Sequence, residues 1–226
     1  MINYIKMVSV IVISHNYGQF LTKCLNSILT NNLNYLKEII IVDDASKDNT
    51  SEVAKKFKKK NKLIKYFKKD FFSLSKSTNF GIKQAKSRFV TKIDADDYVS
   101  KNFLKIFCDE IINKKLDFLY GDLIQIKKNY KKIIKQNYKR KHLFKYPMGS
   151  GTIFSKKIWK SVNGFNEKLF FQDDFDFWLR IKKKNSFSFG YINQAHYFYR
   201  KHNSNMSKNI IQKNLTRLIV IIKNFL

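Results

Sequence analysis

Arg88-Phe-Val-Thr-Lys-Ile-Asp-Ala-Asp-Asp97 is the stretch around which the rest of the chain is organised. Its apolar part, Phe89 to Ile93, has the character of a buried strand, and it runs directly into Asp94, Asp96 and Asp97. Acidic residues are scarce in this protein, with 17 Asp and Glu against 45 Lys and Arg. Three carboxylates within four positions repel one another, and such a cluster is usually relieved by a bound cation or by raised pKa values.

The spacing of these acids suits a divalent cation. If the chain stays extended, Asp94 and Asp96 point the same way, because side chains alternate along a strand. Two carboxylates on one side of a strand end offer hard oxygen ligands to Mg²⁺ or Mn²⁺ that carries phosphates. The alternative is an acidic turn that leads into a helix beginning near Ser100.

Strand and helix patterns alternate through the first hundred residues. Nearly continuous apolar runs predict buried strands at 8–14, 38–44, 63–67 and 89–93. Apolar faces at helical spacing predict helices at 20–29, 49–60 and 79–85. Asn49 followed by Glu52 predicts a capping box for the second helix. The alternation predicts an open parallel α/β sheet, whose ligands bind beyond the carboxyl ends of the strands. Five polar residues fall at those ends: Ser14, Asp43, Asp44, Asp94 and Asp96.

The second half is less regular. Ser100 is expected to cap a helix, and the later patterns predict a strand at 117–126, helices at 158–162 and 173–184, a strand at 187–199 and a basic amphipathic tail helix from 209. No internal repeat or Pro/Gly-rich linker separates these elements. We therefore expect one domain over 1–226, with a first half at 1–99, a second at 100–207 and the tail helix at 208–226.

The composition of the chain indicates which binding partners and which cellular compartment to expect. The net charge of +28 favours anionic partners, although the residue usage of an AT-rich genome explains it equally well. Cys24 and Cys108 are isolated, with no zinc-site spacing, which favours a reducing compartment. No signal peptide is visible, and no run approaches the roughly 18 apolar residues that a membrane span needs. These features favour a cytoplasmic protein.

Four motifs, in this order, carry a family resemblance. They are Val8-Ser-Val-Ile-Val-Ile-Ser-His-Asn16, Ile41-Val-Asp-Asp-Ala-Ser-Lys-Asp48, Ile93-Asp-Ala-Asp-Asp97 and Gln172-Asp-Asp-Phe-Asp-Phe-Trp-Leu-Arg180. Together the motifs resemble the family 2 glycosyltransferases, which have the nucleotide-diphospho-sugar (GT-A) fold. The likeness extends from Val8 to Ser207. It implies a Rossmann-like, mostly parallel open sheet flanked by helices, with a nucleotide-sugar-binding first half and a smaller acceptor-side half.

The resemblance also implies roles on the donor side. The loop at Ser14 and the carboxylate of Asp44 would hold the nucleotide base, and a carboxylate can accept the imide N–H of uracil. Asp94 would meet the ribose or the metal shell, and Asp96 would bind the Mn²⁺ or Mg²⁺ that bridges the diphosphate. Further substrate contacts are implied for Asp43 at its strand end, Asn16 of the first motif and Asn79 of an Asn-x-Gly segment.

On the acceptor side, Asp174 matches the catalytic base of the family. Asp173 stands where the family carries Glu, so the first acid of the pair is shorter here. His202 lies where relatives often carry a histidine near the diphosphate. Alternatively, Asp173 and Asp174 are first-turn acids that complement a helix dipole, and His202 is a surface residue.

The function that these roles imply is the inverting transfer of a sugar. Two alternative functions are also compatible with the sequence. The expected partners are a nucleotide-sugar donor, a glycan or lipid-linked saccharide acceptor and an anionic membrane surface on the inner face of the plasma membrane, without sequence-specific nucleic acid. One alternative is an inactive polyanion-binding protein on the same fold, supported by the basic stretch 127–146. The other is a sugar-phosphate nucleotidyltransferase, which would usually carry a Gly-rich loop after the first strand.

Overall fold

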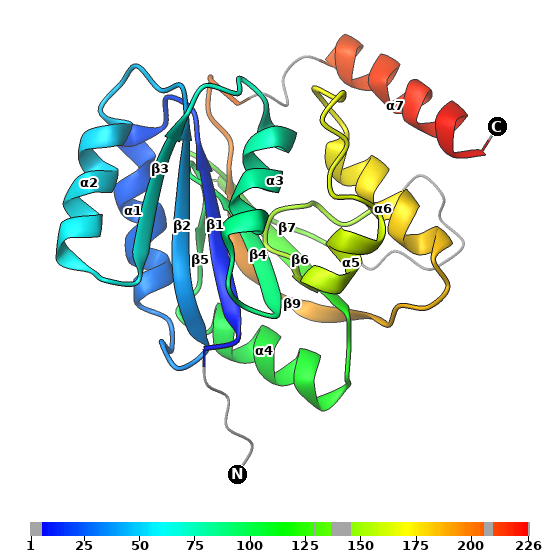
Figure 1. Cartoon of the computed structure of the whole chain (residues 1–226), viewed down its shortest axis with the longest axis horizontal. Helices are drawn as coiled ribbons and strands as arrows, with labels where there is room; N and C mark the ends of the chain where they lie inside the picture. The colour runs from blue at the N-terminus through cyan, green and yellow to red at the C-terminus, as the bar shows by residue number, and fades with distance from the viewer. Residues whose placement is uncertain (1–5, 129, 137–145, 206–209, 226) are drawn as a thin grey trace.

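The computed structural model describes residues 6–128, 130–136, 146–205 and 210–225 (Figure 1). In these residues nine strands form a single sheet in the order β3-β2-β1-β4-β8-β6-β9-β5, with β7 paired to β6. The strands are β1 (Val8–Ser14), β2 (Leu36–Asp44), β3 (Ile64–Lys69), β4 (Phe89–Asp94), β5 (Tyr98–Val99), β6 (Phe118–Lys127), β7 (Tyr130–Ile134), β8 (Ile153–Ser155) and β9 (Phe189–Arg200). The helices are α1 (Gly18–Leu29), α2 (Thr50–Lys60), α3 (Leu74–Gln84), α4 (Phe103–Asn113), α5 (Lys156–Ser161), α6 (Asp173–Lys183) and α7 (Ile210–Phe225).

The parallel sheet predicted for the first hundred residues is confirmed. β3, β2, β1 and β4 pair in parallel. All seven residues of β1 are buried, because helices cover both faces of the sheet. Residues of α1, α2 and α4 join one apolar cluster, and residues of α3, α5 and α6 join the other (Figure 1). This layering leaves the carboxyl ends of the parallel strands at one edge, where Ser14, Asp44 and Asp94 lie.

The second half extends the same sheet with mixed strand directions. β8 runs antiparallel to β4 and to β6, while β9 runs parallel to β6 and antiparallel to the short β5. α7 lies against α6, where its Val220 is buried with Leu169, Phe175 and Leu179 (Figure 1). The boundary at residue 99 stays a prediction, because the larger apolar cluster draws residues from both halves.

Two predicted helix starts are wrong, and α2 begins directly after Asn49 as expected but without the predicted capping bond. The helix expected at 79 begins at Leu74, where the Ser73 hydroxyl accepts the amide N–H of Lys76. Asn49 makes no capping bond; the carboxylate of Asp48 accepts both the amide and the hydroxyl of Thr50 instead. Ser100 does not cap α4, because pairing of β5 with β9 brings its hydroxyl 2.8 Å from Nδ1 of His196. The bonds of Ser73 and Asp48 are local, at i,i+3 and i,i+2, whereas the Ser100 contact depends on the tertiary pairing of β5 with β9.

The acidic stretch is a turn. β4 ends at Asp94, and the amide of Asp97 donates to the carbonyl of Asp94 at 3.0 Å. The chain therefore does not stay extended past Asp94, and the alternative of an acidic turn describes the local structure. Asp94 and Asp96 nevertheless line the same cavity, because the turn redirects the second carboxylate.

Within the described residues, no helix is long and apolar enough to cross a bilayer. The tail helix expected from 209 is observed as α7. Part of the basic stretch 127–146, at 129 and 137–145, and the segment 206–209 lie outside the described residues.

Candidate active site

A cavity of about 840 Å³ opens at the carboxyl ends of the parallel strands. Both halves of the chain and α7 contribute to its walls. Its acidic residues are Asp44, Asp94, Asp96, Asp173 and Asp174, and its cationic residues are Lys92, Lys201 and Lys213. The predicted metal-side and base-side acids therefore face one space, although about 80 residues separate them in the sequence.

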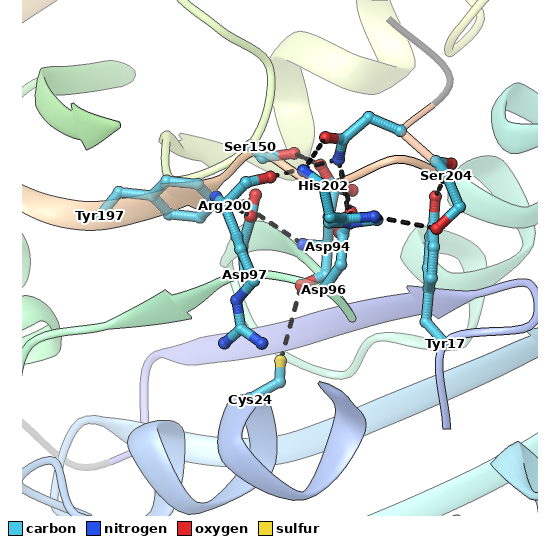
Figure 2. Close-up of polar contacts among 11 residues, drawn as sticks. Tyr17, Cys24, Asp94, Asp96, Asp97, Ser150, Tyr197, Arg200, His202 and Ser204 are labelled. Atoms are coloured by element: carbon cyan, nitrogen blue, oxygen red, sulfur yellow. Dashed lines mark hydrogen bonds and ion pairs between the residues drawn. The ribbon is translucent and has the colours of Figure 1, made fainter. Parts of the chain in front are cut away.

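Asp94 is held from two sides. The ammonium of Lys92 lies 3.0 Å from Oδ1 of Asp94, and the hydroxyl of Ser150 donates to Oδ2 at 2.5 Å (Figure 2). Lys92 belongs to β4, and Ser150 belongs to the loop that leads into β8. Because both carboxylate oxygens have protein donors, the plane of the Asp94 carboxylate is fixed before any ligand binds.

Asp96 contacts the segment that follows β9. Its Oδ2 lies 2.8 Å from Nε2 of His202 and accepts the amide of Asn205 at 3.1 Å (Figure 2). Burial, and then the neighbouring charge of Asp94, raise the pKa of Asp96, while His202 acts in the opposite direction. His202 therefore lies against the acid turn. Its contact with a diphosphate stays a prediction.

Asp97 is a structural member of the acid turn. Its Oδ2 accepts the hydroxyl of Tyr197 at 2.6 Å, and its Oδ1 accepts the amide of Arg200 at 2.7 Å. Burial, together with the charges of Asp96 and Asp94, raises its pKa well above the usual value for Asp. These bonds tie the turn to β9, so the second half of the chain sets the position of the donor-side acids.

Asp173 and Asp174 open α6 and also line the cavity. Burial, followed by the charge of Asp174, raises the pKa of Asp173 to about 6. Burial also raises the pKa of Asp174, against the opposing effects of Lys92 and of the Gly149 amide, which donates to Oδ2 at 3.3 Å. A raised pKa makes Asp174 a stronger base near neutral pH. The first-turn position alone does not account for this burial in a cavity wall.

The neighbouring acids Asp43 and Asp44 point their side chains to opposite faces of the sheet, and only Asp44 reaches the cavity. Asp44 lines the cavity, and its oxygens accept the amides of Phe71, Phe72 and Ser73 at 2.7 to 2.9 Å. Asp43, its neighbour on the strand, lies on the opposite face and accepts the Tyr66 hydroxyl at 2.7 Å. Asp44 thus orders the loop after β3 and keeps about one acceptor position for a further donor, because a carboxylate accepts about four bonds.

Ser14, Asn16 and Asn79 are not among the cavity-lining residues. Ser14 is buried, and the Asn16 carboxamide accepts the amide of Lys47. The Asn79 carboxamide accepts from Trp159 and Phe165 at 2.9 Å each, which joins α3 to the segment after α5. The positions beside Ser14 do reach the cavity, through His15 and Tyr17. Substrate contacts of Ser14, Asn16, Asp43 and Asn79 stay predictions.

The donor set at the end of β4 fits a hard divalent cation. It offers carboxylate oxygens with an imidazole beside them, and burial together with the charge of Asp94 raises the pKa of Asp96, a cost that a bound cation would relieve. Among the described residues, no group of three or more His, Cys, Asp or Glu side chains forms a complete ligand shell. Mg²⁺ and Mn²⁺ sites commonly use one or two carboxylates, with phosphates and water as the other ligands. Asp96 is the carboxylate that would hold such an ion.

Sequence reasoning did not find Lys92, Ser150 or Asn205. Lys92 sits within the apolar run of β4, and a charged residue inside a buried strand is a signal that could have identified it. Gly149-Ser-Gly151 was recognisable as a turn or binding loop that follows the proline at 147. Nothing local marks Asn205, because its contact with Asp96 spans 109 positions.

Known proteins share both the sequence pattern and the fold. The family model described as Glycosyl transferase family 2 matches residues 9–178. The uncharacterized glycosyltransferase MG060 of Mycoplasma genitalium is 30% identical over 180 residues, which cover 73% of this chain and 60% of that protein. The chain spans 16% and 33% of the length of two other curated relatives, GlyA of Streptococcus pneumoniae and EpsJ of Bacillus subtilis.

Two solved structures show the same architecture. TarS 1–349 of S. aureus, in complex with UDP-GlcNAc, has a TM-score of 0.79 at 24% identity and matches 97% of this chain and 68% of that one. The mannosyltransferase PcManGT of Pyrobaculum calidifontis, in complex with GDP-Man and Mn²⁺, has a TM-score of 0.76 at 15% identity and matches 97% of this chain and 64% of that one. With the family model matched over most of its length, the chain belongs to glycosyl transferase family 2 and has the GT-A fold.

Proposed function

We propose that this chain is an inverting glycosyltransferase that moves a hexosyl or N-acetylhexosaminyl group from a UDP-sugar to a hydroxyl of a glycan or lipid-linked acceptor. The observation that carries the proposal is the shared cavity, in which Asp94 and Asp96 face the buried pair Asp173 and Asp174. Cell-surface polysaccharide biosynthesis in the cytoplasm, at the inner face of the plasma membrane, is the process that such an acceptor implies. The UDP-GlcNAc bound by TarS supports the choice of donor.

In the proposed reaction Asp174 is the general base. An acceptor hydroxyl is a weak nucleophile, so Asp174 removes its proton as the new glycosidic bond forms. The Gly149 and Phe175 amides donate to the two oxygens of Asp174, at 3.3 and 2.8 Å, and hold the carboxylate in place. The bond from the anomeric carbon to the diphosphate oxygen breaks in the same displacement, which inverts the configuration. No second carboxylate is needed as a nucleophile.

Asp94 and Asp96 would bind the leaving group. Asp96, oriented by His202 and Asn205, would hold Mn²⁺ or Mg²⁺, and Asp94 would meet the ribose or the ion's outer shell. When bound, such an ion neutralises the charge that develops on the β-phosphate. The Mn²⁺ in the PcManGT complex supports this requirement.

The two alternatives from the sequence are less well supported. An inactive polyanion-binding protein gains nothing from five buried or half-buried carboxylates around one cavity, since they repel an anion. A nucleotidyltransferase would place phosphate-binding amides after β1. There the chain carries His15, whose Nδ1 contacts the carbonyl of Asp44, and Asn16.

A thermal-shift panel of nucleotide sugars with and without Mn²⁺ tests the proposal. A true donor at about one hundred times its Kd adds roughly 2.7 kcal/mol to the free energy of unfolding, or a Tm rise of several degrees. UDP-sugars are expected to give this rise only with the metal, and radiolabel transfer to glycan acceptors then identifies the product. Equal Tm values for every nucleotide sugar, with a rise for polyphosphate, would favour the polyanion-binding alternative.

The same proposal includes docking on an anionic bilayer through α7. One face of this helix is buried on α6, and the other exposes five large aliphatic side chains: Ile211, Leu215, Leu218, Ile219 and Ile222. The helix contains no acidic residue, and the net charge of +28 suits an anionic surface better than a second copy of the chain. An amphipathic helix of this kind lies in the membrane interface and does not span the membrane.

Liposome flotation tests the docking. We expect binding to anionic vesicles at low salt, little binding to neutral vesicles, and a loss of binding in Leu215→Ser/Leu218→Ser. Leu33→Ser, which changes an exposed leucine away from α7, is the matched control. Protein that stays in the soluble fraction with anionic vesicles at low salt would rule out the docking and favour genome bias as the origin of the lysines.

A further inference from the structure

The loop Gly149–Gly151 contacts the donor-side and base-side acids through adjacent residues. The hydroxyl of Ser150 donates to Oδ2 of Asp94 at 2.5 Å, and the amide of Gly149 donates to Oδ2 of Asp174 at 3.3 Å. Figure 2 shows Ser150 over the acid turn, on the side opposite Cys24 of α1. Two adjacent residues therefore span the gap between the two sets of acids in the proposed reaction.

The loop itself is held by backbone bonds. The amide of Gly151 donates to the carbonyl of Lys92 at 2.9 Å, and the hydroxyl of Thr152 donates to the carbonyl of Gly149 at 3.0 Å. The first bond joins the loop to β4, two residues before Asp94. The loop and the acid turn thus share a fixed frame that does not depend on the Ser150 hydroxyl.

Both glycines are sterically required. A Cβ at Gly149 would lie 2.8 Å from Cβ of Asp174, so the loop touches the base directly. Gly151 has φ of +75°, and a Cβ there would lie 2.5 Å from the ring of Tyr197. Tyr197 in turn donates to Asp97 and accepts the amide of Asp94 at 3.3 Å. The same tyrosine therefore supports the loop with its ring and the acid turn with its hydroxyl.

We propose that Ser150 is a positioning residue, which fixes the Asp94 carboxylate relative to the base Asp174. The inference rests on the proposed sugar transfer. Lys92 holds one oxygen of Asp94 and Ser150 holds the other, so loss of the hydroxyl frees the carboxylate to rotate about the remaining contact. Ser150 is buried in the cavity wall, and water would replace its hydrogen bond less rigidly. A donor anchored through a rotating Asp94 would present its anomeric carbon imprecisely to the acceptor oxygen at Asp174.

The test compares Ser150→Ala with Ser155→Ala in the full chain. Ser155 is equally buried, five positions away on β8, and its hydroxyl contacts Asp117 outside the cavity. UDP binding with Mn²⁺ is measured by calorimetry, and kcat and KM are measured with the UDP-sugar found in the nucleotide-sugar panel and an acceptor found by radiolabel transfer. We expect Ser150→Ala to weaken UDP binding and to lower kcat, and the two losses multiplied together should amount to about 10- to 100-fold. This is the size typical of losing a hydrogen bond to a charged group. Ser155→Ala should change neither, and Ser150→Thr should restore part of both.

The outcomes separate this inference from the proposed function. Tm values close to the wild type in all three variants show that folding is intact, as the backbone bonds of the loop predict. Wild-type UDP affinity and kcat in Ser150→Ala would overturn the positioning role while leaving sugar transfer standing. Wild-type protein that binds UDP without transferring sugar would count against the proposed function, and the UDP affinities of the variants would still decide whether Ser150 orients Asp94.

Discussion

The ammonium of Lys92 lies 3.0 Å from the carboxylate of Asp94 in the wall of the cavity that also contains Asp173 and Asp174. Burial lowers the pKa of Lys92, but the charges of Asp94, Asp173 and Asp174 more than offset this effect, so the pKa is raised and the side chain stays protonated. One buried cation thus balances acids from both halves of the chain. Its charge must influence the protonation of the base.

Lys92→Met is expected to move the acid limb of the kcat–pH profile to higher pH. Burial raises the pKa of Asp174, and Lys92 and Lys213 oppose that rise, so removal of a cation raises the pKa further. The groups that face Asp174 are Asp173 of the same helix, Tyr146, and these two lysines.

Profiles from pH 5 to 9 measure this effect. Lys213→Met is the comparison variant, with a smaller shift expected in the same direction, because Lys92 is the larger of the two cationic influences on Asp174. Superimposable acid limbs for Lys92→Met and wild type would show that Lys92 does not act on the base.

Asp174→Asn is expected to lose turnover and to keep donor affinity. The amide preserves the shape of the side chain but cannot accept a proton, and loss of a general base typically costs about 10²- to 10⁴-fold. Steady-state kinetics and UDP calorimetry separate the two effects. Asp176→Asn is the control, because Asp176 forms an ion pair with Arg180 at 2.6 Å and does not line the cavity. A kcat for Asp174→Asn within threefold of wild type would remove Asp174 from the mechanism.

Asp96→Ala is expected to abolish metal-dependent UDP binding. Asp96 is the carboxylate placed by His202 and Asn205 at the end of β4, and no other carboxylate contacts those two residues in the described parts of the chain. Calorimetry with UDP at several Mn²⁺ concentrations measures the effect, and Asp109→Ala on α4 is the surface control. Unchanged affinity with unchanged metal dependence in Asp96→Ala would show that the ion binds elsewhere.

Asp173→Asn is expected to stabilise the protein at pH 7.5 and to have little effect at pH 3.5. The folded-state pKa of Asp173, about 6, lies above the usual 3.8, so the folded state favours the protonated acid. Its contribution to stability is present below pH 3.8 and is lost as the pH rises through 6. Asparagine does not ionise, so the variant avoids this loss, and its free energy of unfolding at pH 7.5 should exceed that of the wild type by on the order of 1–3 kcal/mol. Urea unfolding at the two pH values measures it, and equal stability of variant and wild type at both would contradict the raised pKa.

The parallel sheet, the family motifs and the acids of the site could all be predicted from the amino-acid sequence. Buried parallel strands are continuous apolar runs, so β1, β2 and β4 were visible within a few residues of their bounds. Asp44 and Asp94 end two of these strands, and Asp174 lies in the first turn of α6. Periodicity and residue type are local properties, so they predict features that depend on neighbours along the chain.

Only the tertiary structure decided which of these side chains meet. The strand pattern could not distinguish Asp44, in the cavity, from Asp43 behind it, nor show that Asn79 bonds to Trp159. It also could not show that Ser150 contacts Asp94, because that contact depends on the antiparallel pairing of β8 with β4. The physical reason is that a hydrogen bond selects its partner by distance and direction in space, and residues 56 positions apart carry no local signal of their approach.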